Sequence, residues 1–338
     1  MIQLEHVPDC PVCKATGAIV ITEAKDPLYG IPGAWNYRCC DRCQSLWMDP
    51  RPPKEAISSL YPENYFTHTD VHQASTIKRS FPLRVWDAVQ HAALRRIGYN
   101  GEKLEIPLKF LGELLLVFPP IGREATRRVY FLPRLPGGKL LDVGCGNGSF
   151  LDRMRTFGWN CEGIEPDPIA AEHARRRGLN IRCSSLEEVN LAPEAYDAIT
   201  MNHVLEHFFD PQAMIAKLSL ALKSGGVLIS ISPNPVGLLA RRFRKAWRQL
   251  DPPRHLVLPS PVGCAIMCQN ARLKAQVFTC WSGSHWSRSQ SRQINACGRV
   301  VHTHCSFLDK LYAYSIAPLL NMFLANSGEE VAFVAIRQ

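Results

Sequence analysis

The stretch LLDVGCGNGSF, residues 140–150, constrains this chain of 338 residues more than any other feature. An apolar run typical of a buried strand leads into Gly144, Gly146 and Gly148, and an amphipathic segment follows. Glycines are needed where the backbone turns sharply and must lie close to a ligand. The stretch therefore predicts a strand, a tight ligand-facing loop and a helix, which together open a parallel α/β sheet.

From residue 137 onward, strands of the buried type alternate with helical segments. Asp167–Pro168 and Asp210–Pro211 each predict a helix start, because the Asp can cap the helix and the Pro suits its first turn. The expected strands begin at Lys139, Cys161, Leu179, Tyr196, Gly226, Lys274 and Glu330. This alternation predicts an α/β fold with a Rossmann-like, seven-stranded, mostly parallel sheet and helices on both faces.

Two carboxylates indicate which ligand the glycine loop fits. Asp142 lies just before the glycines, and Glu165 ends the next expected strand. The spacing D-x-G-x-G-x-G differs from the G-x-G-x-x-G of dinucleotide sites, since position 149 is Ser. Asp142 would repel a pyrophosphate but attract an ammonium group, and Glu165 can accept hydrogen bonds from both ribose hydroxyls. The pattern favours an adenosyl ligand without a pyrophosphate.

Together with YDAITMNHVLEHFFDP, residues 196–211, these motifs resemble the class I S-adenosylmethionine (SAM)-dependent methyltransferases, in particular the ubiquinone-biosynthesis-like group. The resemblance covers residues 137–280 and implies a methyltransferase domain over 136–338. The family often has an Asp near position 185 for the adenine amine, which this chain lacks. The implied cofactor contacts are Asp142, Gly144, Cys145, Gly146, Gly148, Glu165, Pro166, Ser185, Leu186, Asn202 and His203.

Two C-x-x-C pairs stand near the N-terminus: Cys10 with Cys13, and Cys40 with Cys43. Each pair places two thiolates on one turn, and two pairs complete a closed tetrahedral site, so the expected zinc ion is structural. We expect reduced cysteines, because the chain is large and shows no export signal. Residues 1–62 are therefore predicted to form a zinc-ribbon-like module.

The following segment RPPKEAISSLYPENYF, residues 51–66, resembles the N-terminal zinc-binding region of some bacterial sugar and secondary-metabolite methyltransferases. Tyr61 and Tyr65 match its Tyr-x-x-x-Tyr stretch. The resemblance implies a small-molecule, sugar-nucleotide or glycan acceptor, including nucleotide- or lipid-diphosphate-linked forms. We interpret residues 63–135, with helical segments broken by proline and glycine, as a helical connector or lid.

Methyl transfer from SAM is an in-line displacement, so the protein must align the acceptor and, for an oxygen or carbon acceptor, remove a proton. Candidate bases are His203 and His207 in NHVLEH, and His255 in DPPRHL. The alternative for NHVLEH is a structural turn after the fourth strand of the sheet.

The formal net charge of +9 suits an anionic partner. Residues 238–250 predict one amphipathic basic helix, either a plain surface helix or a patch for diphosphate, nucleic acid or acidic lipid. The alternative function is an RNA methyltransferase. Against it, the NHVLEH segment lacks the motif typical of base-amine methylation, and we do not expect nucleic acid as a partner. A non-catalytic SAM-binding scaffold is the second alternative. Without a secretory signal or a convincing membrane span, we expect a cytoplasmic protein, with peripheral membrane contact as an option.

Overall fold

The computed structural model describes residues 4–61, 81–99 and 105–338, so Tyr65 lies outside the described residues. Its contacts divide the chain into two compact units. The first unit comprises Met1–Tyr65, Asn190–Ala195 and Met201–Gln338, and the second comprises Phe66–Val189 and Tyr196–Thr200.

Seven strands are hydrogen-bonded in the order β10-β11-β8-β7-β4-β5-β6. Strands β4, β5 and β6 are parallel, whereas β11 is antiparallel to both of its neighbours. The strands are β4 (Lys139–Val143), β5 (Asn160–Glu165), β6 (Asn180–Cys183), β7 (Tyr196–Asn202), β8 (Leu222–Pro233), β10 (Leu273–Cys280) and β11 (Glu330–Arg337). The predicted seven-stranded, mostly parallel α/β sheet is confirmed.

In the second unit, helices follow the strands as the capping residues predict. Helix α4 (Ser149–Thr156) starts after Gly148, and α5 (Pro168–Arg176) is capped by Asp167, whose Oδ1 accepts a hydrogen bond from N of Ala170 at 2.8 Å. Both helices pack against the strand beside them. These two strand–helix connections position the glycine loop at the start of α4.

The same unit contains the helices expected before the sheet: α1 (Phe81–Arg96), α2 (Ile106–Leu115), α3 (Pro119–Thr126) and the short η3 (Arg127–Val129). Helix α1 packs on α2 and α3 around a small apolar core that includes Val89, Leu116 and Ala125. A Cβ on Gly112 would lie 2.6 Å from O of Ala88, so this glycine lets α1 and α2 approach closely. No helix in the described ranges is long and apolar enough to cross a membrane.

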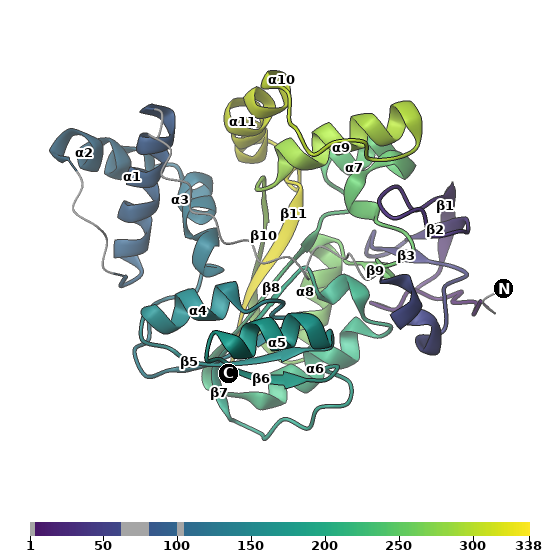
Figure 1. Ribbon diagram of the computed structural model, residues 1–338, viewed down its shortest axis with the longest axis horizontal. Helices are drawn as coiled ribbons and strands as arrows, with labels where there is room; N and C mark the ends of the chain where they lie inside the picture. The colour runs from purple at the N-terminus through teal and green to yellow at the C-terminus, as the bar shows by residue number, and fades with distance from the viewer. Residues whose placement is uncertain (1–3, 62–80, 100–104) are drawn as a thin grey trace. The chain divides into compact units, whose positions relative to one another are not determined.

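In the first unit, β8, β11 and β10 run side by side (Figure 1). Helix α6 (Pro211–Ala221) packs on β8, and α8 (Pro261–Asn270) packs on β10 and β11. Asp210 caps α6 as expected, accepting a hydrogen bond from N of Ala213 at 2.9 Å, and Ser260 caps α8 in the same way.

A smaller antiparallel sheet in the first unit has the strand order β1-β2-β3-β9 (Figure 1). Its strands are β1 (Gly17–Ala24), β2 (Trp35–Cys40), β3 (Leu46–Met48) and β9 (Val257–Leu258), and the short helix η1 (Lys54–Leu60) follows β3. Leu46 pairs with Leu258, and Tyr37 and Trp247 are buried in one core. The N-terminal strands therefore share a sheet and a core with residues about 200 positions later.

The prediction of one amphipathic helix over residues 238–250 is wrong. The segment forms α7 (Leu238–Phe243), η5 (Arg244–Ala246) and η6 (Arg248–Leu250). The chain turns at Arg244, which has a φ of 49°, and Trp247 is buried with its Nε1 donating to Oε1 of Glu329 at 2.8 Å. Burial of the tryptophan, rather than a continuous exposed stripe, decides the conformation.

Residues 281–325, for which the sequence predicts no element, contain several helices in the structure. They form α9 (Ser284–Cys297), α10 (Phe307–Leu311), the π-helical turn η7 (Tyr312–Ile316) and α11 (Ala317–Phe323). The last short element, η4 (Leu205–His207), follows β7 directly.

Candidate functional site

The glycine loop adopts a backbone that glycine alone takes easily. Gly144, Gly146 and Gly148 have φ values of 67°, 54° and 77°. N of Gly144 donates to O of Ile164 at 2.8 Å, which ties the loop to the end of β5. A Cβ on Gly146 would meet no atom within 4 Å, so the space beside this residue is open to a ligand.

The two predicted carboxylates lie at this loop. Asp142 is 3% exposed, and its Oδ1 accepts a hydrogen bond from Oγ1 of Thr200 at 2.6 Å. Burial raises the pKa of Asp142 to about 7; the Thr200 bond opposes this shift and the charge of Glu165 adds to it. Glu165 is also buried, and its Oε2 accepts a hydrogen bond from N of Gly146 at 2.7 Å. The structure thus joins glycines and carboxylates in one site.

Four more residues of the expected cofactor set belong to the same unit as this loop. Cys145 is buried beside Gly163. A Cβ added to Gly163 would lie 2.6 Å from Sγ of Cys145. Pro166 directly follows β5, and Leu186 is buried in the segment after β6. Oγ of Ser185 is buried and has no hydrogen-bond partner among the described residues. A buried hydroxyl of this kind is what a polar ligand group would satisfy.

Asn202 and His203 stand where β7 ends. Oδ1 of Asn202 is buried without a partner in the described part of the chain. His203 lies between two carboxylates, with Nδ1 at 3.3 Å from Oε1 of Glu206 and Nε2 at 2.9 Å from Oε1 of Glu330. Burial alone would lower the pKa of His203, but these carboxylates raise it to about 9. His203 is therefore a cation at neutral pH, which makes it a poor base.

His207 and His255, predicted as candidate bases, lie together in the first unit. Their ring centroids are 4.9 Å apart, and fully buried Glu206 adjoins both rings. We call Glu206, His207 and His255 the histidine cluster. Burial, only partly offset by the nearby carboxylates of Asp251 and Glu206, lowers the pKa of His255 to about 4, so its ring is neutral at physiological pH.

Each ring of the histidine cluster is held through its Nδ1. Nδ1 of His255 is 2.7 Å from O of Gln249, and Nδ1 of His207 is 3.0 Å from O of Arg254. Nδ1 of His207 also lies 3.1 Å from the hydroxyl of Tyr61, the first tyrosine of the predicted Tyr-x-x-x-Tyr stretch. These contacts orient both rings.

A buried ion-pair network that the sequence does not predict supports His255. Arg254, 1% exposed, binds both carboxylate oxygens of Asp26 at 2.8 and 2.9 Å and also donates to Asp251 at 2.8 Å. Burial by itself would raise the pKa of Asp26. The Arg254 guanidinium outweighs this effect and holds the pKa of Asp26 below its usual range. The hydroxyl of Tyr37 donates to O of His255 at 3.0 Å. The N-terminal strands thus position the turn that carries His255.

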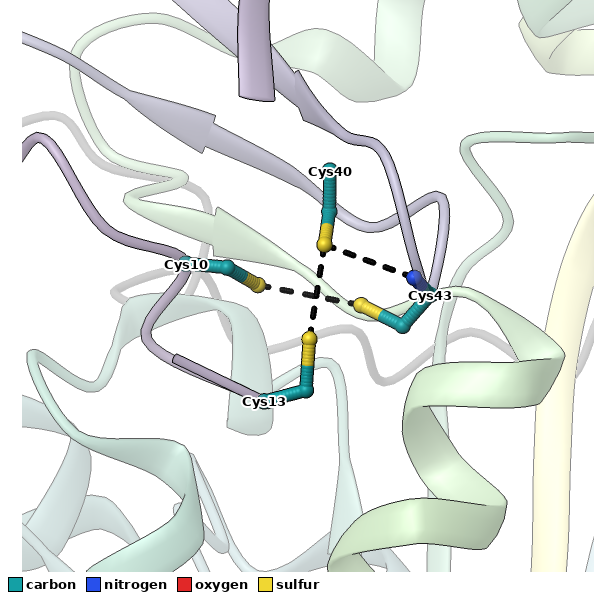
Figure 2. A group of neighbouring side chains, drawn as sticks. All are labelled: Cys10, Cys13, Cys40 and Cys43. Carbon is teal, nitrogen blue, oxygen red and sulfur yellow. Dashed lines mark hydrogen bonds between the residues drawn. The ribbon is translucent and has the colours of Figure 1, made fainter. Parts of the chain in front are cut away.

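The four predicted metal ligands come together with their sulfurs facing one another (Figure 2). Sγ of Cys10 is 3.7 Å from Sγ of Cys43, Sγ of Cys13 is 3.4 Å from Sγ of Cys40, and all four sulfurs lie within 4.8 Å of one another. Zn–S bonds of about 2.3 Å place the sulfurs of a tetrahedral site about 3.8 Å apart. The donor set and its spacing therefore fit zinc.

The two cysteine pairs have the same local conformation. Lys14 and Gln44, each one residue after its C-x-x-C pair, have φ values of 59° and 61°. N of Lys14 donates to O of Cys10 at 2.9 Å, and N of Gln44 donates to O of Cys40 at 3.1 Å. Two matching turns of this kind present their thiols to a common centre.

Comparison with known proteins identifies the sheet and its loop. Residues 121–274 match a family model described as a methyltransferase domain. The chain is 26% identical over 216 residues to a ubiquinone biosynthesis O-methyltransferase of Nitrobacter winogradskyi, which covers 60% of this chain and 76% of the relative. It is 34% identical over 134 residues to the protein of that name from Hahella chejuensis, covering 36% of this chain and 56% of the relative.

Among solved structures, Haemonchus contortus phosphoethanolamine N-methyltransferase 2 in complex with SAM matches with 16% identity and a TM-score of 0.44. The match covers 67% of this chain and 52% of that chain.

The family match identifies residues 121–274, which carry the glycine loop, as a SAM-dependent methyltransferase domain. Its relatives are named ubiquinone O-methyltransferases at low identity, and the chain spans about half the length of several of them, including the one from Photorhabdus laumondii at 56%. SAM is the cofactor of this domain.

Proposed function

We propose that this protein transfers the methyl group of SAM to a small-molecule, sugar-nucleotide or glycan acceptor. The observation that carries the proposal is the glycine loop with its open space at Gly146 and its two buried carboxylates, Asp142 and Glu165. The negative charge suits a ligand with an ammonium and a sulfonium group and disfavours one with a diphosphate. The names of the relatives support an oxygen acceptor.

Within this proposal, the carboxylate of Asp142 binds the ammonium of SAM, directly or through water, and Glu165 accepts hydrogen bonds from the ribose hydroxyls. Ser185 and Leu186 border the adenine. The family resemblance assigns Asn202, at the end of β7, to the neighbourhood of the sulfonium.

We assign removal of the acceptor's proton to the histidine cluster. Nδ1 of both His207 and His255 faces a backbone carbonyl, so Nε2 is the nitrogen left for chemistry in each ring. We leave His203 out of this role, because the carboxylates of Glu206 and Glu330 beside its ring favour the protonated form.

A labelled-methyl assay tests the function. Purified protein is incubated with methyl-labelled SAM and separate pools of nucleotide sugars, lipid-linked glycans, quinone precursors and RNA. We expect label in a small-molecule or glycan pool and none in RNA. Label in RNA alone would establish the nucleic-acid alternative, and SAM binding without transfer to any pool would favour a scaffold role.

We further propose that the four cysteines hold one structural zinc ion. All four ligand positions are filled by protein, which leaves none for a substrate. Metal analysis should find one zinc equivalent lost in Cys13→Ala. Cys39→Ala serves as the control, because Cys39 adjoins the second pair but is not part of the four-sulfur group. Equal zinc in both variants would refute the assignment.

A further inference from the structure

We propose that the histidine cluster, Glu206, His207 and His255, binds a divalent transition-metal ion at a site separate from the four cysteines. One ligand atom from each of the three side chains lies within 4.8 Å of the other two. All three residues belong to the first unit, and the glutamate is fully buried. Two imidazoles with one carboxylate are the donor set of metal centres that keep an open position.

The hydrogen bonds of the two rings fix which nitrogen carries the proton. Nδ1 of His207 faces O of Arg254, and Nδ1 of His255 faces O of Gln249, at 3.0 and 2.7 Å. A carbonyl oxygen only accepts hydrogen bonds, so each Nδ1 must be the donor. In the neutral ring, Nε2 then has a lone pair. Histidines that ligate metals show this arrangement, with the second nitrogen donating to a backbone carbonyl or a carboxylate.

Glu206 is a buried carboxylate whose nearest ion-pair partner among the described residues is His203. Neither of its carboxylate oxygens accepts a hydrogen bond from the described residues, although Nδ1 of His203 lies 3.3 Å from Oε1 as an ion pair. Nε2 of His255 is 3.9 Å from the same oxygen. A nitrogen lone pair and a buried carboxylate repel each other, and the contact of His203 with Glu206 involves only one of the two carboxylate oxygens. A metal ion at this position would attract both groups.

The backbone already holds the two segments of the cluster in place. N of Leu256 donates to O of Glu206 at 2.8 Å, and the hydroxyl of Tyr37 donates to O of His255. Metal–ligand bonds of about 2.1 Å place tetrahedral ligands about 3.4 Å apart. The three ligand atoms now lie within 4.8 Å of one another, so the side chains must move closer together to share one ion.

The donor set also selects the class of ion. Imidazole nitrogen suits Zn²⁺, Co²⁺ and Fe²⁺, whereas Mg²⁺ and Ca²⁺ prefer oxygen ligands alone. Three protein ligands leave a position for water or for an oxygen of the acceptor. This last consequence rests on the proposed function: an acceptor hydroxyl on the ion would have a lowered pKa and would lose its proton to solvent water, so with the ion bound the two imidazoles would serve as ligands instead of bases.

Cobalt titration of the full-length protein, with zinc retained on its cysteines, tests the site. Co²⁺ bound to imidazole and carboxylate gives weak visible bands, whereas Co²⁺ bound to thiolate also absorbs strongly in the near ultraviolet. We expect one Co²⁺ per chain with the weak bands only and unchanged zinc content. Glu206→Gln and His207→Ala should each weaken Co²⁺ binding at least tenfold.

His173→Ala, which removes a histidine of α5 outside the cluster, should bind Co²⁺ like the wild type. His207 is only partly buried, so its variant tests the ligand role with the smallest disturbance of the core. The proposal fails if the wild-type protein takes up no Co²⁺ beyond its cysteine site, or if both cluster variants bind it normally. SAM affinity, measured on the same samples, tests the methyltransferase proposal separately. Co²⁺ uptake without SAM binding would refute the methyltransferase proposal and leave the metal site standing.

Discussion

The glycine loop and the histidine cluster are two ways of building a site. The loop takes its shape from one continuous stretch, residues 142–148, with Glu165 added from the next strand. In the histidine cluster, Glu206 and His207 come from one segment and His255 from another. The turn with His255 is held by the ion pair of Arg254 with Asp26, which is far away in the sequence. Backbone conformation defines the first site, whereas buried side-chain charges define the second.

This difference leads to distinct sensitivities. Backbone hydrogen bonds such as that from Gly144 to Ile164 hold the loop, and they survive most side-chain changes. The turn at His255 depends on Arg254, which is buried too deeply for solvent to replace a lost ion-pair partner. We expect the stability of the protein to respond most to changes at the histidine cluster and SAM binding to respond most to changes at the loop.

The largest effect is expected for Arg254→Met. It would leave the carboxylate of Asp26 buried without its counter-ion and Asp251 with Arg248 as its remaining guanidinium partner, so the free energy of unfolding should fall by about 3–5 kcal/mol. Urea unfolding followed by tryptophan fluorescence measures the loss. The control is Arg176→Met, which removes an exposed pair with Glu172 and should cost less than about 0.5 kcal/mol. Similar losses in both variants would remove the contrast between the two regions.

Next in size is the effect of Asp142→Ala on SAM affinity. Without the carboxylate at the loop, calorimetry should show SAM binding weakened about 100-fold, which corresponds to about 2.7 kcal/mol. Asp152→Ala, which removes a carboxylate on the surface of α4, should change the affinity less than about twofold. Undiminished affinity in Asp142→Ala would refute the assignment of the cofactor site.

Gly148→Ala should lower the free energy of unfolding by about 2 kcal/mol. Its φ of 77° is strained for alanine, and the new Cβ would lie 2.5 Å from Cδ1 of Leu179. Gly225→Ala is the matched control, because Gly225 has a φ of 76° but open space around its Cβ, so only the backbone penalty of about 1 kcal/mol applies. Equal losses would show that close packing beside the loop contributes nothing.

The smallest effect is a pH dependence of SAM binding. The pKa of Asp142 is raised to about 7, and the cationic ligand favours the ionised carboxylate. Below pH 7 binding must therefore displace a proton, and the affinity should fall about tenfold per pH unit, levelling off above pH 7. Asp142→Asn should abolish this slope in calorimetric titrations between pH 5.5 and 8. If the SAM affinity of Asp142→Asn still fell with decreasing pH, the proton displaced on binding would belong to another group.

Features determined by local sequence could be predicted from the sequence. The glycine loop, the helix caps at Asp167 and Asp210 and the two cysteine pairs depend on neighbouring residues, and the structure places them as expected. The sheet followed because strands such as β4 and β7 are short stretches rich in apolar residues that alternate with capped helices.

Long-range contacts between charged side chains left no local signal. Glu330 lies 127 residues after His203, yet its carboxylate lies 2.9 Å from Nε2 of this histidine and, together with Glu206, raises its pKa. The pair of Asp26 with Arg254 joins segments that look like ordinary turns in the sequence. The helix predicted over 238–250 failed for the same reason, because burial of Trp247 overrides local periodicity.

The pairing of β3 with β9 has a consequence for how the chain matures on the ribosome. At a synthesis rate of about 5–20 residues per second, Asp26 and Tyr37 emerge roughly 10–40 seconds before Arg254 and His255. The four cysteines all belong to the first 43 residues, so the ion we propose there can be captured while the small sheet still lacks its last strand. Translation thus sets an order in which metal capture comes early and the histidine cluster is completed late.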